Sequence, residues 1–136
     1  MCQVFEEDVC DTEGSPLLWL WRGQGEEMKF SEYQDVSTRT MPKGLSRGDL
    51  LSNLCLGLAG ESGEFVDLMK KHLYHGHYLD VEAVKSEMGD ILWYLSSLAV
   101  ALGVDLGDVA EMNVDKLKSR YPNGFDSERS RTRVED

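Results

Sequence analysis

Two acidic segments, Glu61-Ser62-Gly63-Glu64 and Glu87-Met88-Gly89-Asp90, decide how this 136-residue chain is interpreted. Each segment offers two carboxylates three positions apart, a spacing that puts both on one face of a helix. Glu61 falls on the same helical stripe as leucines and a phenylalanine, and Glu87 on a stripe of valine, isoleucine, tyrosine and leucine. The acids therefore lie among apolar side chains, whereas a solvated acidic face would lie opposite them.

Four carboxylates on core-facing helix surfaces cannot all stay ionised, because repulsion and desolvation raise their pKa values. A hard divalent cation with oxygen ligands relieves this conflict. If the two segments lie on adjacent antiparallel helices, they predict a cage for one or two Mg²⁺ ions, with Mn²⁺ as a substitute. The alternative is two separate, exposed acidic patches.

Apolar periodicity predicts an all-α, four-helix-bundle-like fold with no strands. The helices are expected at about 30–39, 47–73, 81–102 and 105–120. The third is apolar around much of its circumference after Asp90, which in so short a chain predicts a subunit interface.

The chain divides into three predicted parts: an extension at 1–27, a catalytic domain at 28–125 and a flexible tail at 126–136. Residues 1–27 have no sustained period, so we expect a poorly ordered segment. An alternative is that translation starts at Met28, because Gly25-Glu26-Glu27 can be encoded by a purine-rich ribosome-binding sequence.

Composition excludes several classes of protein. No run of eighteen apolar residues exists, so no membrane span is expected. The net charge of −11 and the absence of a basic stripe argue against binding duplex nucleic acid. Three cysteines without metal-ligand spacing indicate a reducing compartment, and we expect a cytoplasmic protein.

Three glycines, Gly57, Gly60 and Gly63, recur at a spacing of three inside the predicted second helix. Each costs about 1 kcal/mol relative to alanine in a helix interior. Close approach of another helix, or of a bound ligand, would explain the row.

With these features laid out, the chain resembles the MazG-like family of all-α nucleoside triphosphate pyrophosphohydrolases. The resemblance covers about residues 28–125. The matching segments are Phe30-Ser31-Glu32-Tyr33-Gln34, residues 56–64, residues 87–90 and residues 113–122.

The resemblance implies Mg²⁺-dependent cleavage between the α- and β-phosphates of a nucleoside triphosphate, which yields a monophosphate and pyrophosphate. The resemblance leaves the substrate open, because small house-cleaning members take non-standard or damaged deoxynucleotides, others take ordinary ones, and related folds cleave dUTP or phosphoribosyl-ATP. The family assembles as homodimers or dimers of dimers. By position, the metal ligands and catalytic acids would be Glu61, Glu64, Glu87 and Asp90. The substrate-binding residues would be Asn113, Lys116 and Arg120.

Three other functions compete with this interpretation. A di-iron bundle pairs glutamates with an ExxH step, and here the corresponding positions hold Glu64 and Asp90, which argues against iron. A non-catalytic helical interaction module would use the acids as a structural metal site. A nucleotide sensor would bind a triphosphate without hydrolysing it.

Overall fold

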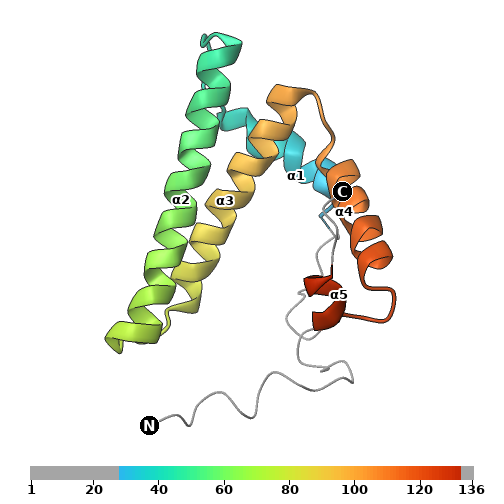
Figure 1. Cartoon of the computed structure of the whole chain (residues 1–136). Coiled ribbons are helices and arrows are strands. Elements are labelled where there is room, and N and C mark those ends of the chain that lie inside the picture. The colour runs from blue at the N-terminus through green and yellow to red at the C-terminus, as the bar shows by residue number, and fades with distance from the viewer. Residues whose placement is uncertain (1–27, 133–136) are drawn as a thin grey trace.

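The computed structural model of the chain describes residues 28–132, which form an arrangement of helices without strands (Figure 1). The helices are α1 (Phe30–Ser37), the 3₁₀ turn η1 (Thr38–Thr40), α2 (Arg47–His75), α3 (Val81–Leu102), α4 (Leu106–Arg120) and α5 (Ser127–Arg131). The predicted all-α class is thereby confirmed for these residues.

Local capping explains where the two long helices begin and end. The Ser46 hydroxyl accepts a hydrogen bond from the Asp49 amide, and the Asp80 carboxylate accepts from two amides in the first turn of α3. Both helices stop at glycines in the left-handed conformation, Gly76 (φ 70°) and Gly103 (φ 75°). Such caps satisfy amides and carbonyls that a helix end leaves free.

Helices α2 and α3 form an antiparallel hairpin, the most extensively packed pair in the described chain (Figure 1). Gly57 allows this close approach, because a Cβ atom there would overlap the ring of Tyr94. The ring of Tyr94 also packs edge-on against Trp93, with centroids 4.8 Å apart. Close approach of another helix, one of the two reasons proposed for the three glycines, therefore applies to Gly57.

Helix α1 and η1 pack on the end of α3 that is distant from its N-terminus. The Trp93 indole donates hydrogen bonds to the Ser37 carbonyl and the Thr40 hydroxyl, each at 2.9 Å. The Ser37 and Ser96 hydroxyls are 3.1 Å apart, and Ser96 is fully buried. Helix α4 packs mainly on α1 and makes an angle of 106° with α3.

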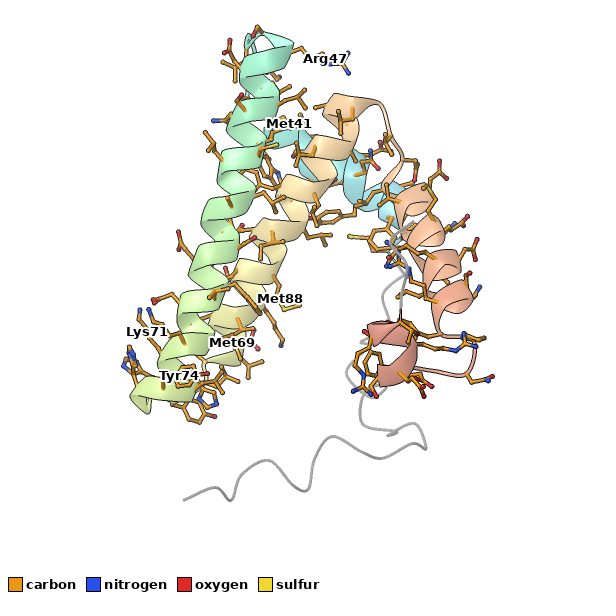
Figure 2. The ribbon with its side chains drawn as sticks, in the orientation of Figure 1. Met41, Arg47, Met69, Lys71, Tyr74 and Met88 are labelled. Carbon is orange, nitrogen blue, oxygen red and sulfur yellow. The ribbon has the colours of Figure 1, made fainter. Side chains whose placement is uncertain are left out.

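The core of the described chain is small. Its buried apolar residues are Leu54, Ala99 and Leu106, while several larger ones remain substantially exposed, including Met88 and Leu95. Met88 extends from α3 on the side away from α2 (Figure 2).

The observed elements differ from the expected ones at their ends. Helix α1 stops at Ser37 because the last turn tightens to a 3₁₀ geometry, and α2 continues to His75. Within residues 28–132 the structure has five α-helices, one more than the four expected. The additional helix, α5, forms within the predicted tail, where the Asp126 carboxylate caps the amides of Glu128 and Arg129. The predictions for residues 1–27 lie outside the described residues.

No single helix in the described range is long and apolar enough to cross a membrane. The bent pair α3 and α4 meets that test when the two helices are taken together, by length and composition alone.

Candidate metal centre

Three carboxylates meet between α2 and α3. One oxygen from each of Glu61, Glu87 and Asp90 lies within 4.8 Å of the others. Glu61 comes from the middle of α2, and the other two stand three positions apart on α3, so the hairpin brings together the two segments identified in the sequence. We call these three residues the acidic cluster.

Burial differs within the acidic cluster. Glu61 and Glu87 are half-buried, whereas Asp90 is exposed. Of the four acids expected on core-facing surfaces, Asp90 and Glu64 are thus exposed, and that expectation was wrong for these two. The exposed side provides a direction from which a ligand can approach.

Glu64, the fourth predicted acid, does not join this cluster. Its side chain is exposed, although its charge still acts on Glu61. The hairpin thus assembles three of the four predicted ligands around one point and leaves the fourth beside them.

The electrostatics of Glu61 reflect this crowding. Desolvation is the largest cause that raises the pKa of Glu61, followed by the negative charges of Glu64, Asp90 and Glu87. A carboxylate surrounded by others is stabilised in its protonated form until a cation compensates the charge.

The donor set fits a hard divalent cation. Carboxylate oxygens are the ligands that Mg²⁺ and Mn²⁺ prefer. Opposite ligands of an octahedral Mg²⁺ ion lie about 4.2 Å apart, since each bond is about 2.1 Å. The oxygens of the acidic cluster lie within 4.8 Å of one another, so a cation bound between them would draw the three carboxylates closer together.

A groove of about 280 Å³ runs along α2 from this centre. Its lining comprises Gly60, Gly63, Glu64, Asp67, Leu68, Lys71 and Glu87. Gly60 and Gly63 have no heavy atom within 4 Å of the position where a Cβ would stand. Packing within residues 28–132 therefore does not explain these two glycines, unlike Gly57.

Asp67 and Lys71 also line the groove, and neither residue was predicted from the sequence. Lys70 and Lys71 both pair with Asp67, and their hydrogen bonds lower the pKa of Asp67 to about 2. Steps of three and four residues connect Glu64, Asp67 and Lys71 along α2. That spacing is the signal that would have placed them on the face of Glu64.

Tyr33 is a second residue that lies near the acidic cluster. Desolvation raises the pKa of its phenol, the charge of Asp90 raises it further, and a hydrogen bond with the Ser37 side chain opposes the shift. Helix α1 therefore approaches the metal centre on the side of Asp90.

The predicted substrate residues lie on a different helix from the acidic cluster, which is formed by α2 and α3. Asn113, Lys116 and Arg120 belong to α4, which packs mainly on α1. Asn113 and Lys116 are exposed; Arg120 is half-buried, and its buried Nε has no hydrogen-bond partner among the described residues.

An all-α fold with carboxylates converging between two antiparallel helices defines a class of helical proteins with an acidic cation site. Comparison with known families identifies the particular one. The model of the MazG nucleotide pyrophosphohydrolase domain matches residues 50–125, more than half of the chain. The chain belongs to the MazG nucleotide pyrophosphohydrolase family.

One relative has been found in a phage. The chain is 36% identical over 78 residues to the Gene 37 protein of Mycobacterium phage L5, a match that covers 54% of this chain and 68% of the phage protein. No solved structure matches the chain with significance.

Proposed function

We propose that this chain is a Mg²⁺-dependent hydrolase that cleaves (deoxy)nucleoside triphosphates between the α- and β-phosphates, releasing a monophosphate and pyrophosphate. The observation that carries the proposal is the acidic cluster of Glu61, Glu87 and Asp90, whose oxygens lie within 4.8 Å of one another. Removal of non-standard nucleotides is the biological role we propose for this activity.

The acids would hold Mg²⁺, or Mn²⁺ in its place. Bound divalent cations would neutralise the triphosphate and make a water molecule more acidic. The clustered carboxylates supply the ligands, and Glu61 or Glu64 accepts the proton from the attacking water. Glu64 is exposed beside the groove, so we propose that it contributes once the triphosphate and its cations occupy the groove.

Helix α4 would provide the contacts to the substrate. Asn113 offers an amide, while Lys116 and Arg120 offer cations that stabilise negative charge on the phosphates. These residues lie three and four positions apart, so they share one face of α4.

We further propose that the protein works as a homodimer or a dimer of dimers. A pocket of about 570 Å³ lies against α2 and α3, and its lining is almost entirely apolar: Phe65, Lys85, Met88, Gly89, Ile91, Leu92 and Leu95. Exposed apolar surface of this kind favours association. Light scattering after gel filtration tests this, and we expect Leu95→Glu to shift the molecular mass toward that of the monomer.

Pyrophosphate release tests the proposed activity. Canonical, uracil-containing and oxidised triphosphates are each incubated with the protein in Mg²⁺ or in chelator. The matched variants are Glu87→Gln, in the acidic cluster, and Glu82→Gln, on the first turn of the same helix beside Lys85. We expect release that requires Mg²⁺, disappears in Glu87→Gln and persists in Glu82→Gln.

Two results would contradict the proposal. Triphosphate binding without pyrophosphate release would indicate a sensor. Neither binding nor release, in a folded protein that still binds Mn²⁺, would indicate an interaction module with a structural metal site.

A further inference from the structure

Gln34 connects α1 to the corner between α3 and α4. Its side-chain Nε2 donates to the Val104 carbonyl at 3.0 Å, and its Oε1 accepts from the Leu106 amide at 2.8 Å. The side chain is half-buried, and both contacts span about seventy residues of sequence. A single side-chain amide thus uses its donor and its acceptor on one short segment of backbone.

Leu106 is buried at this corner, and within residues 28–132 the hydrogen bonds of residues 103–108 other than those with Gln34 are all local. Gly103 ends α3 in the left-handed conformation, and Leu106 begins α4 only three residues later. The Asp105 carboxylate caps the next two amides of α4, those of Gly107 and Asp108. The amide of Leu106 is the one that Gln34 satisfies, so the clamp completes the N-terminus of α4.

The other end of α1 is attached to α3. Trp93 bonds Ser37 and Thr40, and the Ser37 hydroxyl meets that of Ser96. Helix α1 is therefore bonded to α3 through Ser37 and to the start of α4 through Gln34. Because α1 connects the two helices at different points, it restrains the 106° angle between α3 and α4.

We propose that Gln34 is a positioning residue, which holds α4 at its angle to α3 and so presents Asn113 and Lys116 to the triphosphate. The inference rests on the proposed function, because it concerns the substrate contacts of that same site. Gln34 itself lies at the base of α4, whereas Asn113 and Lys116 lie two and three turns further along the helix. A small rotation at the base therefore displaces the two side chains by a larger distance.

Gln34→Met tests the inference in the full chain, because methionine has a similar length and forms neither hydrogen bond. The matched control is Thr40→Val, which removes one bond between η1 and α3, while the bonds of Ser37 with Trp93 and Ser96 still attach α1 to α3 and the corner is untouched. We expect KM for the triphosphate to rise about tenfold in Gln34→Met with kcat within about threefold, since displaced binding groups weaken ground-state and transition-state binding alike.

Two further measurements separate positioning from general instability. Affinity for Mn²⁺ alone should stay within about twofold of wild type in Gln34→Met, because the acidic cluster lies on α2 and α3. Amide hydrogen exchange should accelerate in residues 106–120 and stay unchanged around residues 61, 87 and 90. In Thr40→Val, KM should match wild type.

An unchanged KM in Gln34→Met, or an equal rise in Thr40→Val, would overturn the inference. If Gln34→Met does not fold, Gln34→Glu replaces it. This variant keeps an acceptor for the Leu106 amide and loses the donor to the Val104 carbonyl, so we expect a smaller rise in KM. No rise in KM would refute the positioning role of Gln34. If wild type binds the triphosphate without releasing pyrophosphate, the proposed function fails, and the dissociation constant of the same triphosphate replaces KM as the test of Gln34.

Discussion

The hairpin of α2 and α3 and the arm formed by α4 are built in different ways. The hairpin is held by a long contact along both helices, where Gly57 admits the ring of Tyr94, and it carries the acidic cluster. The arm packs mainly on α1, which reaches its base through the side chain of Gln34. The proposed metal ligands therefore stand on the more extensively packed part, and the proposed phosphate contacts stand on a helix with fewer tertiary contacts, whose base is bonded by Gln34.

The largest expected effect separates the acidic cluster from its neighbour Glu64. Glu61→Gln should lower kcat/KM by about 10²- to 10³-fold, because it removes a ligand at the point where the carboxylates converge. It should also weaken Mn²⁺ binding in calorimetry. Glu64→Gln should reduce turnover but leave Mn²⁺ affinity, measured without nucleotide, close to that of wild type. Equal losses of Mn²⁺ affinity in both variants would show that four acids hold the ion.

The next effect tests the arm. Lys116→Met should raise KM about tenfold or more by removing a cation from the phosphates, with Mn²⁺ affinity unchanged. Lys118→Met is the control, because Lys118 lies on the same helix and pairs with Asp115 at 3.5 Å. Steady-state kinetics of pyrophosphate release provide the measurement. The same KM in both variants would argue against a substrate role for Lys116.

Two glycines on α2 give opposite predictions for stability. Gly57→Ala should destabilise the hairpin by about 1–3 kcal/mol, because the new methyl group would overlap the Tyr94 ring. Gly60→Ala should stabilise the protein by about 1 kcal/mol, since its surroundings are open and alanine favours helix. Urea denaturation of the metal-free protein measures both. A neutral Gly57→Ala would mean that the ring can move aside.

Gly60→Ala also serves as a test of the groove. If a ligand lies against α2 beside the acidic cluster, the added methyl group should raise KM while the stability increases. A more stable variant with unchanged KM would show that the groove is not part of the substrate site.

The smallest effects concern pH. The folded-state pKa of Glu61 is raised, so the folded protein binds more protons than the unfolded chain, and lowering the pH through that range should stabilise the metal-free protein. The pKa of Asp67 is lowered to about 2, so its contribution is present above the ordinary value of 3.8 and is lost as the pH falls toward 2. Melting temperatures of Glu61→Gln and Asp67→Asn, measured from neutral pH down to about pH 2, separate the contribution of Glu61 from that of Asp67.

We expect Glu61→Gln to melt above wild type at neutral pH, and to lose that advantage in acid. Asp67→Asn should melt below wild type at neutral pH, with the difference vanishing near pH 2. If the melting temperatures of wild type and both variants changed with pH in the same way, the pKa shifts assigned to Glu61 and Asp67 would be wrong.

Sequence alone was sufficient for much of the fold. Hydrophobic periodicity depends on neighbours within a few residues, as do the helix ends at Gly76, Asp80 and Gly103, so the expected bounds of α2 and α3 were nearly correct. The same local logic placed Glu61 with Glu64, and Glu87 with Asp90, on common helix faces. It also indicated a cation site, because four acids on two apolar-lined faces need compensation.

Tertiary structure decided which of these groups meet. Glu61 joins Glu87 and Asp90 while Glu64 remains beside them, since the hairpin crossing selects one turn of α2 to oppose one turn of α3. The three glycines share a spacing but not a role, because only Gly57 faces Tyr94. The direction of α4 depends on the contact of Gln34 with residues about seventy positions away. Periodicity is a property of neighbours along the chain, and such long-range contacts arise only when the helices pack.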